Sequence, residues 1–212
     1  MPYKPDYSYI PPMNKDWLTS WYDCICTITG FGRRFKMKVL DLSSIKDGDT
    51  IVDVGCGTGM FLALAKEKYP RAHLIGVDPD KKALAIARHR LTKNGGSVEL
   101  HDAYAESIPL QSASADVCVS SLAFHHMPDE VKEKAAEEIF RILKPGGRVI
   151  IADFGKGGNW LLRKVLGLFE NVEYLKGNFQ GLIPVYLEKA GFKNIKLLSA
   201  YLWGVHIISA QK

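Results

Sequence analysis

The residues best suited to chemistry lie in a short glycine-rich stretch, Val54-Gly55-Cys56-Gly57-Thr58-Gly59. An apolar, β-branched run from Ile51 to Val54 leads into it, and a helical pattern from Met60 to Tyr69 follows it. This order predicts a strand, a tight turn and a helix. Glycine lets the backbone turn sharply and lets a ligand approach without a Cβ in the way. The stretch therefore indicates a ligand-binding loop at the end of a strand.

A second apolar run, Ala72 to Val77, ends in the carboxylate of Asp78, which is followed by Pro79. The two runs and the helix between them form the βαβ unit of a nucleoside-binding sheet. A carboxylate at the end of the second strand can accept hydrogen bonds from both hydroxyls of a ribose. We therefore expect Asp78 and Pro79 to hold a nucleoside, and Gly55 to Gly57 to approach the rest of the ligand.

Two ligand classes compete for this loop. A pyrophosphate dinucleotide site requires the pattern Gly-x-Gly-x-x-Gly, but the sixth position here is Met60. Asp53 also lies just before the turn, where its negative charge would oppose a pyrophosphate. The same charge suits a cationic ligand that carries an ammonium and a sulfonium. A tight turn without any ligand is the purely structural alternative.

In these features the chain resembles the class I S-adenosylmethionine-dependent methyltransferases, whose first motif reads much like Val52 to Gly59. Leu122 to Pro128 resembles the Leu-x-x-His-His-Met/Leu-Pro stretch of the methyltransferase type 11 group, and Arg141 to Arg148 matches a further family segment. The resemblance implies S-adenosylmethionine as cofactor and S-adenosylhomocysteine as product. It implies cofactor contacts at Asp53, Gly55, Cys56, Gly57 and Asp78.

The resemblance extends these contacts to other parts of the chain. In the family, an acid after the third strand receives the adenine amino group and the next N–H reaches the ring, which implies Asp102 and Ala103. The segment from Tyr22 to Phe35 is similar to the entry helix of the ubiquinone and menaquinone biosynthesis C-methyltransferases, so that Tyr22 would approach the cofactor. A tyrosine on a core-facing stripe and a simple strand-end aspartate remain open alternatives.

The reacting end of the site should follow the strand Asp116 to Ser121. Open α/β sheets bind ligands outside the carboxyl ends of their strands, so we expect Ser120 to His126 to line it. His125 is the candidate catalytic base or substrate contact and His126 the lesser one, with packing as the alternative for both. Phe124 to Met127 departs from the Arg-Asn pair that the quinone enzymes carry here.

Composition limits the class of protein. The chain has 212 residues, of which 47% are hydrophobic and 24% charged, typical of one globular domain. No apolar run reaches the length of a membrane span, and we expect a cytoplasmic protein. Cys24 and Cys26 face different ways on a predicted helix, so we expect no metal site there.

The net charge of +5 resides in the last part of the chain, where residues 154–212 hold eight Lys and Arg against three Glu. This excess suits a solvated basic face, an anionic substrate or a membrane surface. Within an insertion at 154–182, the segment Asn159 to Glu170 has an amphipathic helical pattern flanked by glycines, Gly177 among them. We expect either a surface helix or a mobile lid, which would suit an apolar or prenylated acceptor and weak contact with anionic membranes.

These observations predict one α/β domain over residues 1–212, with a helical cap at 1–45. Its core would be a Rossmann-like, doubly wound, seven-stranded and mostly parallel sheet with the last strand antiparallel. The expected activity is S-adenosylmethionine-dependent methyl transfer to a small-molecule or lipid-like acceptor. The alternatives are a catalytically silent cofactor-binding module and an RNA methyltransferase. Ser120 to Ala123 stands where base-methylating enzymes carry Asn/Asp-Pro-Pro-Tyr, which argues against nucleic acid. The acceptor and the oligomeric state stay open.

Overall fold

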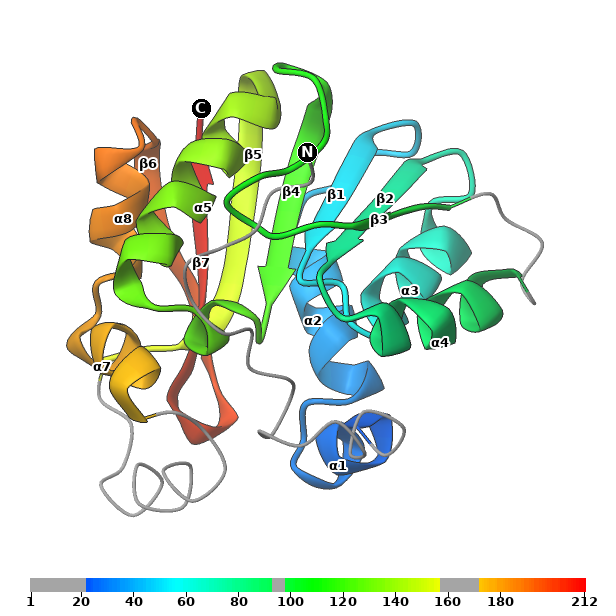
Figure 1. Ribbon diagram of the computed structural model, residues 1–212, viewed down its shortest axis with the longest axis horizontal. Coiled ribbons are helices and arrows are strands. Elements are labelled where there is room, and N and C mark those ends of the chain that lie inside the picture. The colour runs from blue at the N-terminus through cyan, green and yellow to red at the C-terminus, as the bar shows by residue number, and fades with distance from the viewer. Residues whose placement is uncertain (1–21, 93–97, 157–171) are drawn as a thin grey trace.

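Seven strands form a single sheet in the computed structural model, which describes residues 22–92, 98–156 and 172–212 (Figure 1). The order across the sheet is β3-β2-β1-β4-β5-β7-β6. In chain order the strands are β1 (Thr50–Val54), β2 (His73–Asp78), β3 (Glu99–Asp102), β4 (Ala115–Ser121), β5 (Leu143–Phe154), β6 (Lys193–Tyr201) and β7 (Val205–Gln211). The predicted seven-stranded architecture is confirmed.

The direction of the strands places the site. The pairs from β3 across to β5 are all parallel, whereas β7 runs antiparallel to both β5 and β6. From β1 the chain first builds outward through β2 and β3, and it then returns to place β4 on the other side of β1. A crevice opens where the strand order reverses in this way, beyond the carboxyl ends of the strands. In this sheet it lies beyond Val54 and Ser121.

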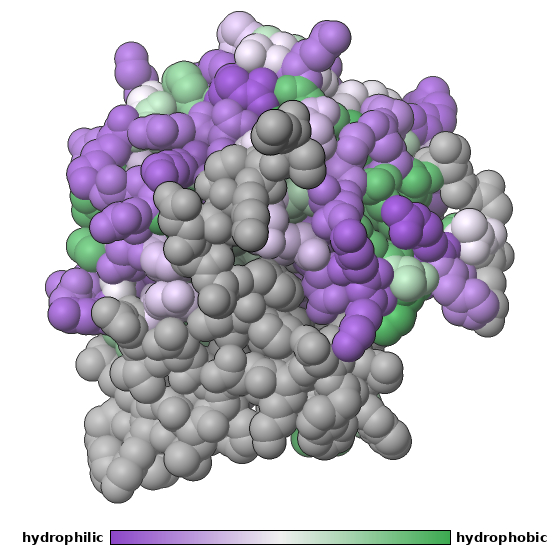
Figure 2. Space-filling view, in the orientation of Figure 1, coloured by the Kyte–Doolittle hydropathy of each residue, from purple (hydrophilic) through white to green (hydrophobic). Residues whose placement is uncertain are grey.

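Helices cover both faces of the sheet (Figure 1). They are α1 (Tyr22–Ile28), α2 (Arg33–Leu42), α3 (Met60–Lys68), α4 (Lys81–Thr92), α5 (Asp129–Ile142), α7 (Val172–Gln180) and α8 (Ile183–Lys189), with short 3-10 turns at Phe124–His126 and Leu202–Gly204. Successive residues of β4 serve opposite cores: Val117 and Val119 pack with α2, α3 and α4, and Cys118 packs with α5 and α8. Because both faces are buried, the strands are apolar throughout rather than alternating. The surface over α5 and α8 is mainly hydrophilic (Figure 2).

The fifth strand contains the segment Pro145-Gly146-Gly147, whose residue types favour a turn. Nevertheless β5 already starts at Leu143, which pairs with Ala115. The register then shifts, and regular pairing resumes at Arg148 opposite Val117. The Pro-Gly-Gly segment is therefore an irregularity inside the strand, with Gly146 at φ +77°. A single bridge before the irregularity is enough to extend the strand.

Gly177 does not have the hinge role expected for it. It lies within α7, where a Cβ would come 2.3 Å from Asp129 Oδ1 and 2.6 Å from the Tyr186 hydroxyl. Glycine is required here by close packing, which holds α7 against α5 and α8. The predicted amphipathic helix at Asn159 to Glu170 lies outside the described residues. Within the described part of the chain, no helix is long and apolar enough to cross a membrane.

Candidate functional site

The glycine loop joins β1 to α3 at the crevice. Its first two amides, of Gly55 and Cys56, donate to the Val77 carbonyl at 2.8 and 3.1 Å, which holds the loop against the end of β2. Gly55 has φ +77°, and a Cβ there would come 2.4 Å from the Ala123 Cβ. Gly57 has φ +52°, and its missing Cβ would meet nothing within 4 Å. The loop therefore packs closely on the β4 side and faces open space at Gly57.

Asp78 holds this loop in place. One carboxylate oxygen, Oδ2, accepts the Gly57 N–H at 2.8 Å, and Oδ1 accepts the Asp80 N–H at 2.9 Å. Desolvation by burial raises the pKa of Asp78 to about 6, although these two backbone bonds oppose the shift. Each carboxylate oxygen has a second acceptor site beyond the bond it already makes. Asp78 can therefore fix the loop and accept ligand hydroxyls at the same time.

Asp53 is a second buried carboxyl under the loop. Desolvation raises its pKa to about 7, the nearby charge of Asp78 adds to the shift, and the charge of Lys36 opposes it. Its Oδ1 has no hydrogen-bond partner in the described part of the chain. Burying a carboxyl without a full set of partners costs stability, and such groups occur preferentially at functional sites. Asp53 therefore lies beneath the loop, where a cationic ligand above it would favour the ionised carboxylate, and it does not line the open cleft.

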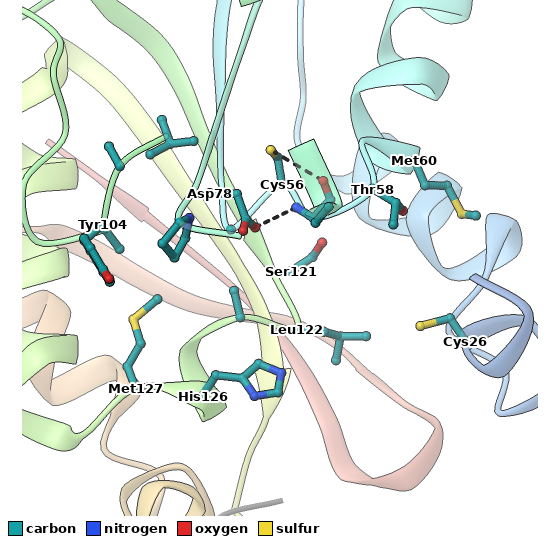
Figure 3. A pocket seen from close by; sticks show the side chains of 18 of the residues that line it. Cys26, Cys56, Thr58, Met60, Asp78, Tyr104, Ser121, Leu122, His126 and Met127 are labelled. Carbon is teal, nitrogen blue, oxygen red and sulfur yellow. Dashed lines mark hydrogen bonds between the residues drawn. The ribbon is translucent and has the colours of Figure 1, made fainter. Parts of the chain in front are cut away.

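The cleft itself opens beyond the carboxyl ends of β1, β2 and β4 (Figure 3). Six of the predicted ligand residues line it, namely Gly55, Cys56, Gly57, Asp78, Pro79 and Ala103. Tyr104 and Met127 lie at one end and Met60 and Cys26 at the other, with Asp78, Cys56 and Ser121 between them (Figure 3). The cleft is thus long enough to join a nucleoside-binding part to a largely apolar part.

Two predicted contacts on the strands lie beside the cleft without lining it. Asp102 ends β3 with a side chain 46% exposed, and its Oδ2 is 3.4 Å from Lys81 Nζ. Ser120 is 1% exposed and faces away, because neighbouring residues of a strand point to opposite faces, so that Ser121 lines the cleft instead. Tyr22 is the first residue of α1, and its side chain lies outside the described part. The roles of these three residues stay predictions.

The two histidines after β4 have different surroundings. His125 is 5% exposed, with Nδ1 2.9 Å from Asp153 Oδ1, and it does not line the cleft. His126 does line it, although we had ranked it second. The two residues share a 3-10 turn, and their rings lie 4.1 Å apart, centroid to centroid. His125 is turned toward Asp153, which leaves His126 as the imidazole that lines the cleft.

Asp153, at the end of β5, organises the buried histidine. Besides His125, it accepts the Phe154 N–H at 2.7 Å and the Asn178 amide at 3.1 Å. Burial acts to raise the pKa of Asp153, but the charge and hydrogen bond of His125 outweigh it, so the pKa lies below its usual range. An ionised carboxylate only accepts hydrogen bonds, so His125 Nδ1 carries the proton. The sequence alone did not point to Asp153.

Other lining residues were also missed. Cys26 comes from α1, Phe31 from the link between α1 and α2, and Lys36 from α2, while Tyr104 and Glu106 follow β3. Lys36 Nζ lies 2.6 Å from Ser121 Oγ and 3.3 Å from the Ser121 carbonyl. In the sequence, Lys36 is one of several basic residues on a helix, and nothing separates it from its solvent-facing neighbours.

Known proteins that resemble this chain belong to one family. The family model described as a methyltransferase domain matches residues 51–147. A demethylmenaquinone methyltransferase of Thermus thermophilus is 32% identical over 171 residues, covering 78% of this chain and 76% of the relative. A ubiquinone/menaquinone biosynthesis C-methyltransferase of Hydrogenovibrio crunogenus is 30% identical over 153 residues, covering 70% and 59%.

Solved structures agree on the fold. Phosphoethanolamine N-methyltransferase 2 of Haemonchus contortus, in complex with phosphomonomethylethanolamine and S-adenosylhomocysteine, superposes with a TM-score of 0.74 at 20% identity, over 94% of this chain and 58% of that one. A methyltransferase of Aquifex aeolicus that depends on S-adenosylmethionine gives a TM-score of 0.72 at 21% identity, over 93% and 98%. At these identities the likeness establishes the architecture alone.

The buried carboxyl of Asp53 gives a test in pH. Its pKa of about 7 in the folded protein lies above the roughly 3.9 of an unfolded aspartate. The folded state therefore binds this proton more tightly. The contribution of Asp53 to the free energy of unfolding falls as the pH rises from about 4 to about 7. Asp53→Asn cannot ionise, so its stability relative to the parent should increase across this range, as measured by urea unfolding between pH 5 and pH 8.

Asp116 supplies the matched control. Burial acts to raise its pKa, but bonds from Lys144 and the Thr50 N–H hold the pKa below its usual range. Asp116 is therefore ionised throughout the tested range, and Asp116→Asn should differ from the parent by a constant amount. A constant difference for Asp53→Asn as well would contradict the raised pKa.

Proposed function

The chain belongs to the class I S-adenosylmethionine-dependent methyltransferases, and we propose that it methylates a small, largely apolar acceptor in the cleft beyond β1 and β4. The observation that supports this proposal is one continuous cleft in which the glycine loop and Asp78 adjoin apolar side chains. These side chains are Cys26, Phe31, Met60, Leu122 and Met127. The first group suits a nucleoside, and the second suits an acceptor without many hydrogen-bonding groups.

The residues present fit the cofactor. Asp78 has acceptor sites left for the ribose hydroxyls, and Gly57 leaves the loop open on the cleft side. Ala103 and Tyr104 line the cleft next to β3, where the adenine would lie. The carboxyl of Asp53 lies beneath the loop without a partner for Oδ1 in the described residues, which favours a cationic ligand above it. When bound, S-adenosylmethionine supplies an electrophilic methyl group on a positively charged sulfur.

The contribution of the chain is alignment and exclusion of water. The nucleophilic atom of the acceptor must approach the methyl group in line with the carbon–sulfur bond, and sulfur takes the bonding electron pair as the new bond forms. The positive charge on sulfur is lost in this step. Dry, apolar walls therefore favour the less charged transition state over the charged starting state. Phe31 and Leu122 provide such walls next to the end of β4.

We propose a reduced quinone-type ring as the first acceptor class to test. This rests on two relatives whose names describe C-methylation in quinone biosynthesis or demethylmenaquinone methylation, and the chain spans 76% and 59% of their lengths. Carbon methylation of such a ring releases one ring proton, which a nearby base must accept. The apolar lining of the cleft suits the ring, whereas the histidine pair at the end of β4 departs from the quinone enzymes.

We propose His126 as the residue that accepts this proton and His125 as its positioning residue. The His125 ring lies 4.1 Å from the His126 ring, centroid to centroid, and Asp153 fixes its orientation. This assignment replaces the sequence-based preference for His125, because His126 lines the cleft and His125 does not.

We also propose contact with anionic membranes near the mouth of the cleft. Ile28 is 80% exposed, Leu202 55% and Trp203 52%. The Trp203 indole donates to the Thr29 carbonyl at 2.9 Å, which joins the turn between β6 and β7 to the end of α1. Cys26, two residues before Ile28, lines the cleft, so an acceptor dissolved in a bilayer would enter close by. Lys38 Nζ lies 5.4 Å from the centroid of the Tyr201 ring, next to Leu202. Exposed apolar residues beside a basic one favour such a surface.

Loss of the Asp78 carboxylate tests the cofactor site. Asp78→Ala should weaken S-adenosylhomocysteine binding by roughly 1.5–3 kcal/mol, the range for a hydrogen bond to a charged group. Asp102→Ala should have a smaller effect, because Asp102 faces Lys81 and does not line the cleft. Calorimetry measures both. Unchanged affinity in Asp78→Ala would remove Asp78 from the site.

Replacing each histidine separates their roles. A positioned base contributes about 10²–10⁴-fold to the rate, so His126→Ala should lower kcat by that order with a demethylated quinol and labelled cofactor. His125→Ala should lower kcat less, because it removes the positioning residue and leaves His126 in the cleft. The reverse pattern would return the catalytic role to His125.

The membrane contact can be measured with vesicles. The parent should sediment with phosphatidylglycerol vesicles at low salt and release at high salt, because the attraction to the surface is partly electrostatic. The double variant Leu202→Ser, Trp203→Ser should bind clearly less. Val185→Ser is the control, since Val185 is 40% exposed on α8. Equal binding by all three proteins would refute the surface.

A further inference from the structure

We propose that Lys36 binds the carboxylate of the methionine part of the cofactor and so serves as a cofactor-positioning residue. The inference rests on the placement of the cofactor proposed above. Lys36 extends from α2 to the end of β4, where Nζ lies 2.6 Å from Ser121 Oγ and 3.3 Å from the Ser121 carbonyl. Both Lys36 and Ser121 line the cleft.

The helix that carries Lys36 is firmly held. Phe35, Val39 and Leu40 are fully buried in the core beneath α2, and the Phe35 ring packs 5.4 Å from Phe31 and 5.0 Å from Tyr201, centroid to centroid. These contacts fix the rotation of α2 about its axis. The direction of Lys36 toward the cleft is therefore set by core packing, and only the end of its side chain can adjust.

The ammonium of Lys36 stands out electrostatically. Among the described residues that line the cleft it is the sole lysine or arginine, whereas Asp78 and Glu106 supply carboxylates. Its charge also reaches Asp53, because it acts to lower the pKa of that carboxyl. The part of the cleft beside Ser121 thus offers one positive group at its wall and one acidic group beneath the loop.

The cofactor presents a complementary pattern at its methionine end. That end carries one ammonium and one carboxylate, and the carboxylate is the single negative charge of the whole molecule. A cation at the wall of a site for a cationic ligand is unfavourable unless it meets that negative group. We therefore assign Lys36 as the partner of the carboxylate. Asp53 and the carbonyls at the end of β4 are then the partners of the ammonium.

The geometry of the cleft brings the two groups together. Asp78 and Ala103 fix the nucleoside end, and Cys56 and Ser121 follow in that order from Asp78 (Figure 3). A ligand anchored at Asp78 and laid along the glycine loop ends beside Ser121, where Lys36 Nζ lies. A negative group on the acceptor is the competing partner for Lys36. Binding measurements without acceptor distinguish this group from the cofactor carboxylate.

Calorimetry with three ligands tests the assignment. S-adenosylhomocysteine carries both charged groups, its decarboxylated analogue 5′-deoxy-5′-(3-aminopropylthio)adenosine carries only the ammonium, and 5′-methylthioadenosine carries neither. A charge-assisted hydrogen bond is worth about 1.5–3 kcal/mol. Lys36→Met should therefore bind S-adenosylhomocysteine roughly 10- to 100-fold more weakly. It should bind methylthioadenosine as the parent does and the decarboxylated analogue at least as tightly.

Matched variants complete the experiment. Lys38→Met removes a lysine from the same helix that does not line the cleft and lies 5.4 Å over the Tyr201 ring, so it should change none of the three affinities. Lys36→Arg should recover part of the loss, because a guanidinium still pairs with a carboxylate.

Three outcomes would overturn the assignment. An equal loss for all three ligands in Lys36→Met would mean that Lys36 only shapes the site. Unchanged S-adenosylhomocysteine binding with a raised KM for the acceptor would assign the ammonium to an acceptor anion. If Asp78→Ala binds methylthioadenosine as tightly as the parent does, the placement of the cofactor itself is wrong, and this inference fails with it.

Discussion

The hydrogen bond between the Gly57 N–H and the Asp78 carboxylate is the contact on which the site depends. It joins the loop after β1 to the end of β2, at the edge where parallel strands deliver their carboxyl ends. Asp78 also accepts the Asp80 N–H, and Asp80 caps α4 through Lys82 and Ala83. One carboxylate therefore sets the conformation of the loop and the start of a helix, and it keeps acceptor sites that a ligand hydroxyl can use.

This arrangement holds two carboxyl groups in a setting that disfavours their charge. Burial raises the pKa of Asp53 to about 7 and that of Asp78 to about 6. The charge of Asp78 adds to the shift of Asp53, and the charges of Asp80 and Asp102 add to that of Asp78. A fold selected only for stability would not retain such a pair. A cationic ligand above the loop would favour the ionised form of both groups.

A third buried carboxylate, Asp153, orients His125 in the turn after β4. Asp153 lies one residue before the end of β5, and its charge is stabilised by His125, the Phe154 N–H and Asn178 from α7. The antiparallel strand β7 covers the outer side of β5 along seven paired residues, which keeps this end of the sheet dry. The surroundings of His125 are thus assembled from β5, α7 and the turn after β4, elements that are distant in the sequence.

The sequence determined the edge of the sheet where the cleft lies, because this follows from local patterns: apolar strands, the glycine turn and a carboxylate at a strand end. The antiparallel last strand was expected from the family resemblance, and it is confirmed. Five of the predicted ligand residues lie in the local patterns and line the cleft, and Ala103, which the resemblance implied, lines it as well. The tertiary structure decided the rest. Which of His125 and His126 meets the cleft depends on the rotation of one short turn, the role of Gly177 depends on α5 and α8, and Lys36 becomes part of the site only because the core packing of α2 points it toward Ser121. Long-range packing of this kind leaves no mark in the neighbouring residues of the chain.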